Sequence, residues 1–230
     1  MKQWFPFTDY DFYAYLTAGM GLLFSLDLAF NGGAIFLRPE WTVIQIIFVI
    51  GLAYIVGQLA AAPSSIVLEH WIARRVFQPP ITVQLALAPA RWRERFVGRY
   101  IIGRYYEPLP EKMRSGILGK VAHKLGTRID AVSDPEEVFQ VAFPVARTVA
   151  DAASRMDQFR NLYGFSRNIA FISIIATVLF AARSIAVADT NFWWFCAAAA
   201  ALGLGAYGRF VKFYAAYAAE VLRTYYAQAI

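Results

Sequence analysis

Two charged residues, Asp27 and Arg183, lie inside long apolar segments of this 230-residue chain. A charge at the centre of a bilayer costs about 2.5–3.5 kcal/mol or more, so it usually has a charged partner or faces water. Asp27 lies about 17 residues into its segment and Arg183 about 16 into its own, which places both at one depth for helices of equal rise. We therefore predict an intramembrane charge pair between Asp27 and Arg183, and such a pair could also serve an ion or proton path. The alternative is that each side chain extends separately to the outer interface, which is within a turn or two of both.

The apolar segments that carry these charges are long enough to cross a membrane. Residues 41–63 form a run of 23 residues without Asp, Glu, Lys or Arg, and about 20 helical residues span the hydrocarbon core. Further spans are predicted at about 10–30, 168–187 and 192–208. The predicted fold class is an all-α polytopic membrane protein, with four transmembrane helices arranged as two hairpins and a cytoplasmic helical domain.

Charged residues are concentrated in the middle of the chain. Residues 64–167 carry 16 of the 22 Lys and Arg. This distribution predicts four parts, namely a first transmembrane hairpin (1–63), a cytoplasmic helical insert (64–166), a second transmembrane hairpin (167–208) and a C-terminal cytoplasmic helix (209–230).

Basic residues near the ends of the spans predict the orientation, because cytoplasmic loops are enriched in Lys and Arg. The residues expected at the membrane surface, against anionic lipid headgroups, are Arg74, Arg75, Arg160, Arg167, Arg209 and Lys212. We expect a bacterial inner (cytoplasmic) membrane protein with both termini in the cytoplasm. Residues 91–106 mix Arg with aromatics and could stack on bases, but lipid contact or domain packing explains them more simply. Nucleic acid is therefore not an expected partner.

Catalytic and metal-binding motifs are not found in the sequence. Cys196 is the single cysteine, so neither a disulfide framework nor a metal cluster is expected. His70 follows Glu69, but no nucleophile or second ligand lies at helical spacing from it. We expect no catalytic residue, no cofactor and no metal.

Local sequence predicts several helix boundaries in the second half of the chain. Asp134 is a good N-cap residue, and Pro135 suits the first helical position. Gly126 is expected to end the preceding helix. Residues 188–191 form a turn so short that the last two spans must run antiparallel.

Small residues in the fourth predicted span suggest self-association. Ala198, Gly203 and Gly205 would let two backbones approach closely, and packing drives helix association in lipid. The alternative is that the alanines only fill the helix. We predict a homo-oligomer that uses this face.

Three segments resemble a group of uncharacterised bacterial inner-membrane proteins with four spans and a cytoplasmic helical insert. They are DFYAYLTAG (11–19), YGFSRN (163–168) and RFVKFYAAYAAEVLR (209–223). Small bacterial membrane proteins of this shape include effectors of phage-defence systems, and the resemblance supplies no catalytic residues.

From these observations we expect a non-enzymatic, self-assembling membrane protein. Its insert and C-terminal helix would sense or dock a cytoplasmic protein partner, and its output could be permeabilisation of the membrane in phage defence. The alternative is a small transporter or channel, or a membrane-embedded lipid enzyme, with a polar site around Asp27 and Arg183.

Overall fold

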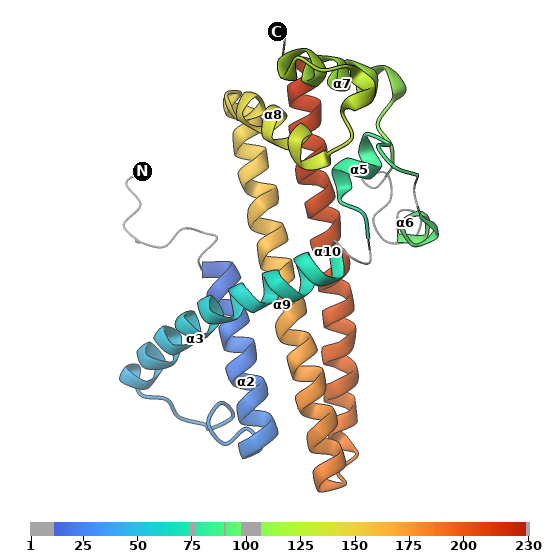
Figure 1. The fold of residues 1–230 in the computed structure, drawn as a ribbon. Helices are drawn as coiled ribbons and strands as arrows, with labels where there is room; N and C mark the ends of the chain where they lie inside the picture. The colour runs from blue at the N-terminus through green and yellow to red at the C-terminus, as the bar shows by residue number, and fades with distance from the viewer. Residues whose placement is uncertain (1–11, 74–76, 90, 98–106, 229–230) are drawn as a thin grey trace. The chain divides into compact units, whose positions relative to one another are not determined.

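The computed structural model describes residues 12–73, 77–89, 91–97 and 107–228. Helix makes up 82% of the structure, and the described residues contain no strand, so the all-α prediction is confirmed. Within the described part of the chain, three helical runs are long and apolar enough to cross a membrane, namely Val43–Ala73, Ala150–Val187 and Asn191–Ala227. Figure 1 shows the last two as the long helices α9 (Ala150–Val187) and α10 (Asn191–Ala227).

The described chain divides into two compact units. Unit 1 contains residues 12–70 and Gly164–Phe210, and unit 2 contains the described residues of Trp71–Tyr163 together with 211–228. Helices α9 and α10 contribute residues to both units. The C-terminal part of α10 therefore belongs to the same unit as the charged middle of the chain.

Unit 1 begins with a helical hairpin. Its elements are the π-helix η1 (Phe12–Leu16), α2 (Thr17–Asn31), α3 (Val43–Ser64) and most of the π-helix η2 (Ser65–Ala73). Thr42 caps α3, because its hydroxyl accepts from the Gln45 N–H at 3.3 Å while the Gln45 side chain accepts from the Thr42 N–H at 3.0 Å. This reciprocal capping box satisfies two of the free donors at the start of the helix.

Small residues let α3 touch both η1 and α2 at one end of the hairpin. A Cβ added to Gly57 would lie 1.9 Å from the Tyr15 carbonyl oxygen, and one added to Gly19 would lie 1.7 Å from that of Ala53. The buried residues of α3 are Ala53, Gly57, Ala60 and Ser64. We call this contact of Tyr15, Gly19, Ala53 and Gly57 the closed end. In Figure 1 the two helices diverge from it toward the loop that joins them.

Helix α9 packs against both α2 and α3 in unit 1. Ile172 of α9 forms a cluster with Ala18 and Ala60. A second cluster joins Ala176 and Phe180 to the last turns of α2. The first hairpin is thus anchored to the membrane-length helix α9 through apolar contacts.

Unit 2 has its own core. Its elements besides the shared helices are α5 (Pro80–Gln84), α6 (Trp92–Val97), α7 (Glu111–Leu125), η5 (Ile129–Ala131) and α8 (Pro135–Arg147). The side chains of Ile117, Val138, Met156, Leu222 and Tyr225 are fully buried in one cluster. Residues 211–228 therefore pack as an integral part of this unit.

Polar contacts also attach the C-terminal part of α10 within unit 2. Gln84 donates to the Ala215 carbonyl at 2.8 Å, and Arg155 pairs with Glu220 at 2.7 Å. Lys120 donates to the carbonyl of Tyr226 at 3.0 Å, which satisfies a carbonyl left free at the end of the helix.

The predicted helix boundaries are confirmed where the structure describes them. The Asp134 side chain accepts from the Glu136 N–H at 2.9 Å at the start of α8. Gly126 follows α7 with a φ of 65°, the left-handed conformation that glycine adopts readily. Helix α9 ends at Val187 and α10 begins at Asn191, as the short turn required.

Candidate functional site

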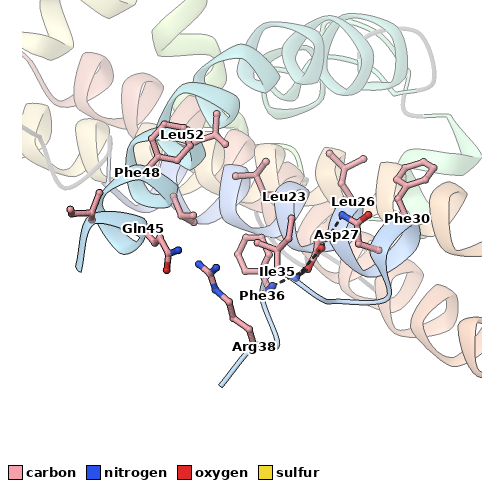
Figure 2. Close-up of a pocket in the computed structure, with 13 residues that line it drawn as sticks. Leu23, Leu26, Asp27, Phe30, Ile35, Phe36, Arg38, Gln45, Phe48 and Leu52 are labelled. Atoms are coloured by element: carbon pink, nitrogen blue, oxygen red, sulfur yellow. Dashed lines mark hydrogen bonds between the residues drawn. The ribbon is translucent and has the colours of Figure 1, made fainter. Parts of the chain in front are cut away.

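Asp27 is buried and organises the loop after α2. Its carboxylate accepts from the Phe36 N–H at 2.9 Å, the Ile35 N–H at 3.1 Å and the Asn31 side-chain amide at 3.2 Å (Figure 2). Gly32 and Gly33 have φ values of 63° and 85°, which reverses the chain and brings these amides back to the helix end. The carboxylate thus stabilises the loop by charge-assisted hydrogen bonds.

Arg183 has a different set of neighbours. Its guanidinium carbon lies 6.0 Å from the centroid of the Phe192 ring, a cation–π distance. Both Asp27 and Arg183 are described, and no ion pair within 4.0 Å joins them. The structure therefore shows no ion pair between the two sequence-predicted charges: Asp27 binds the loop after α2, whereas Arg183 lies near Phe192.

A pocket of about 570 Å³ lies between α2, the loop and α3. Figure 2 shows its walls, which are mostly aliphatic and aromatic. Its lining includes Leu23 and Leu26 of α2 and Phe48 and Leu52 of α3, and Arg38 from the loop also borders it. We call this pocket the wedge. Neither the wedge nor Arg38 was among the sites predicted from the sequence, because the pocket exists only where α2 and α3 diverge.

Arg38 is the cation of the wedge. Its guanidinium carbon lies 3.8 Å from the centroid of the Trp41 ring, so the two side chains form a close cation–π contact. Its buried Nε has no hydrogen-bond partner. Among the described residues no carboxylate lies within 4.0 Å of its guanidinium. The wedge therefore has apolar walls, is bordered by the hydrogen-bonded Asp27 carboxylate, and carries an Arg38 guanidinium that has no ion pair among the described residues.

A buried polar network links η1, α3 and α9 near the closed end. The Ser64 hydroxyl donates to Asn168 Oδ1 at 2.7 Å, and the Asn168 amide donates to the Ala14 carbonyl at 3.3 Å. Ser64 is 0% and Asn168 1% exposed. Polar groups away from water need such partners, so this network fixes how the first hairpin sits against α9.

An ion pair extends the network. Arg167 donates to a Glu69 carboxylate oxygen at 2.9 Å, and the side chains are 10% and 13% exposed. Ser65 also donates to Glu69, at 3.2 Å. Arg167 therefore departs from the prediction of a residue facing headgroups, because its charge is used inside the protein. The YGFSRN segment contains both Arg167 and Asn168, but its sequence alone did not indicate their partners.

Two π-helical segments supply residues that contact Arg167 and Asn168 in this network. Ala14 lies in η1, and Ser65 and Glu69 lie in η2. Helix η2 follows Pro63, which has no N–H to donate to the Leu59 carbonyl. Because π-helices are rare and occur often at functional sites, the Ala14–Ser64–Glu69–Arg167–Asn168 network is a second candidate site.

The remaining basic residues predicted at the membrane surface fall into three groups. Arg209 and Lys212 are exposed. Arg160 is also exposed and pairs with Asp157 at 3.4 Å. Arg74 and Arg75 lie outside the described residues.

The three residues of the predicted oligomer face do not share one environment. Gly203 is buried inside unit 1, and a Cβ added to it would lie 3.1 Å from the Ser173 Cβ of α9. Ala198 is exposed, and a Cβ added to Gly205 would meet no atom within 4 Å. Gly203 thus serves packing within the chain, whereas Ala198 and Gly205 remain available for contact between chains.

Comparison with protein-family models, with curated proteins and with solved structures finds no match to this chain. Its function is therefore inferred from the chemistry of its own residues.

Proposed function

We propose that this chain is a four-span bacterial inner-membrane protein that self-assembles without catalysis and docks a cytoplasmic partner through unit 2. Three of the spans are the apolar helical runs described above. Support for the fourth comes from η1 and α2, whose 5 and 15 helical residues run consecutively from Phe12 to Asn31. About 20 helical residues suffice to cross the hydrocarbon core.

The observation that carries self-assembly is the open face of α10. Ala198 and Gly205 are exposed and lie seven residues apart, which places them on one side of the helix. Leu202 between them is 58% exposed, and Trp194 one turn before them is 79% exposed. A second α10 could approach closely over the small residues and pack between the large ones.

The test of self-assembly is the mass of the detergent-solubilised protein. Changing Ala198 and Gly205 to Leu should shift the mass toward that of a single 25.8 kDa chain. Gly51→Leu is the matched control, because a Cβ at Gly51 of α3 also meets nothing within 4 Å. An unchanged mass for the α10 variant, or an equal loss in the control, would reject this interface.

Charge asymmetry supports the orientation with both termini in the cytoplasm. In a Cys196→Ala background, a membrane-impermeant thiol reagent should label Ala34→Cys and Asp189→Cys from outside intact cells, and should not label Lys120→Cys. Ala34 is exposed and avoids the strained left-handed position of Gly33, whose φ is 85°. Labelling at Lys120 in intact cells would reverse the orientation.

A folded unit 2 supports docking of a partner. Its buried cluster draws on α7, α8, α9 and α10, so it can present a fixed charged surface rather than a flexible tail.

Permeabilisation of the membrane in phage defence is the proposed output. Leakage of a vital dye on expression should appear for the full chain and disappear for the Ala198/Gly205 variant. Leakage that persists in a monomeric variant would separate the output from self-assembly.

A further inference from the structure

The wedge between α2 and α3 combines three features that no other part of unit 1 described above has together. It has a volume of about 570 Å³, within the range of about 300–1,000 Å³ of ligand pockets in proteins. Its walls are largely apolar. A cation without a carboxylate partner borders it at Arg38. We propose that the wedge binds one acyl chain of an anionic phospholipid, with the lipid phosphate held by Arg38.

The medium around the wedge supports a lipid chain as the occupant. The α3 side of the wedge carries Phe48 and Ile44, which are 68% and 80% exposed, on a run apolar enough to cross a membrane. An apolar cavity does not hold water well. In a bilayer, hydrocarbon chains fill such a space at the lowest free-energy cost. This inference rests on the proposed placement of the α2–α3 hairpin in the bilayer and does not require self-assembly.

The charges around the wedge favour an anionic headgroup. Asp27 also borders the pocket, but its carboxylate already accepts two hydrogen bonds from loop amides and one from the Asn31 side chain at the end of α2. Arg38 has no such partner, and a guanidinium can bind two phosphate oxygens at once. Trp41, against which Arg38 stacks, is the type of residue that lies at headgroup depth. An apolar tail in the wedge therefore brings its phosphate to the level of Arg38.

The first measurement uses the full chain without any substitution. The purified protein is incorporated into membranes of equal parts phosphatidylglycerol and phosphatidylcholine with the same acyl chains, and retained lipids are counted by native mass spectrometry. We expect one phosphatidylglycerol per chain to be retained about tenfold better than phosphatidylcholine, because phosphatidylcholine has the same phosphate but also a choline cation, which the Arg38 guanidinium repels. Equal retention of both lipids would overturn the proposal.

Two matched pairs of variants locate the site. Arg38→Gln should abolish the preference for phosphatidylglycerol, whereas Lys212→Gln, which removes an exposed cation elsewhere, should leave it intact. Leu52→Trp should exclude the acyl chain and lose the retained lipid, whereas Leu59→Trp should keep it. Both leucines lie on α3 and are exposed, and of these two only Leu52 lines the wedge.

The outcomes separate this proposal from its alternatives. Equal loss in Arg38→Gln and Lys212→Gln would mean general surface attraction and would overturn the site. A fall in oligomer mass for Leu52→Trp but not Leu59→Trp, with lipid retention unchanged, would assign the wedge to a second copy of the chain. If Ala34→Cys is not labelled, the proposed topology is wrong. The lipid measurement does not depend on that labelling, so the two proposals can fail separately.

Discussion

At the closed end of the α2–α3 hairpin, Gly19 and Gly57 let the two backbones touch, whereas at the loop end Leu23, Phe48 and Leu52 line an open pocket. Both ends belong to the same two apolar helices. The difference lies in the size of the facing side chains. Because lipid tails are as apolar as leucine, close packing rather than hydrophobicity holds helices together in a membrane. Small residues therefore let the helices touch, and large residues that fail to interdigitate leave an open pocket.

The polar groups of the two ends differ in the same way. Near the closed end, Ser64 donates to Asn168, Asn168 donates to the Ala14 carbonyl, and Arg167 pairs with Glu69. At the loop end, by contrast, Arg38 has no carboxylate within 4.0 Å of its guanidinium among the described residues. The closed end is thus held together by polar contacts within the chain, whereas the proposed lipid phosphate would supply the missing anion at the loop end. The predictions below test this contrast in order of expected effect.

The largest effect is expected from adding bulk at the closed end. In Gly57→Leu the new Cβ would lie 1.9 Å from the Tyr15 carbonyl oxygen, so the helices must separate. Overpacking usually costs about 1–3 kcal/mol, and a clash with backbone should reach the upper end or beyond. Thermal unfolding in detergent should show a large loss of stability. Gly51→Leu, on the same helix but facing open space, should change the unfolding temperature little. Equal behaviour of the two variants would mean that the backbones do not meet there.

The Glu69–Arg167 pair should show the second largest effect. Removing one partner of a buried pair costs about 3–5 kcal/mol, and removing both is milder. We expect the lower end for Glu69→Gln and Arg167→Gln, because the side chains are 13% and 10% exposed. A double-mutant cycle should give a coupling above about 1 kcal/mol.

The Arg147–Asp157 pair is the matched control for that cycle. Its atoms are 3.1 Å apart, but both side chains are 39% exposed, so solvent screens the interaction. Its coupling should stay below about 1 kcal/mol. Similar coupling energies for the two pairs would show that the Glu69–Arg167 pair is solvated and stabilises the protein no more than a surface ion pair does.

The smallest effect is the coupling between Asp27 and Arg183. Asp27→Asn should cost about 1–3 kcal/mol, because it weakens hydrogen bonds from two loop amides. Since Arg183 lies against Phe192 instead, the double variant with Arg183→Gln should be additive within about 0.5 kcal/mol. The sequence-based charge pair predicts the opposite, a double variant milder than the sum of the single ones. Unfolding temperatures and membrane accumulation of the three variants decide between these outcomes.

Local sequence was sufficient to predict those helix boundaries that depend only on neighbouring residues. Asp134 and Pro135 predicted the start of α8, and Gly126 predicted the end of α7, because capping depends on the residues within one turn. The absence of charge in 41–63 predicted an apolar helix for the same reason. The capping box of Thr42 and Gln45 was readable in principle, since both residues lie within four positions of each other.

Contacts between distant segments could not be read in this way. Asn168 meets Ser64 and Ala14, which are 104 and 154 positions away in the chain. Equal depth in two helices was a reasonable basis for pairing Asp27 with Arg183, but depth does not specify which face of each helix points inward. The sequence also did not show which side of α10 each glycine lies on. Gly203 packs against α9, and Gly205 does not.

The sequence by itself determined that the chain is helical, apolar in long blocks and basic between them, because helix propensity, capping and hydropathy are properties of neighbouring residues. Only the tertiary structure decided where those helices touch and where they separate. Gly57 and Leu52 lie five positions apart on one helix, yet one closes the hairpin and the other lines a pocket. That difference arises from the crossing of α2 and α3, since two straight helices that meet at one point must diverge away from it.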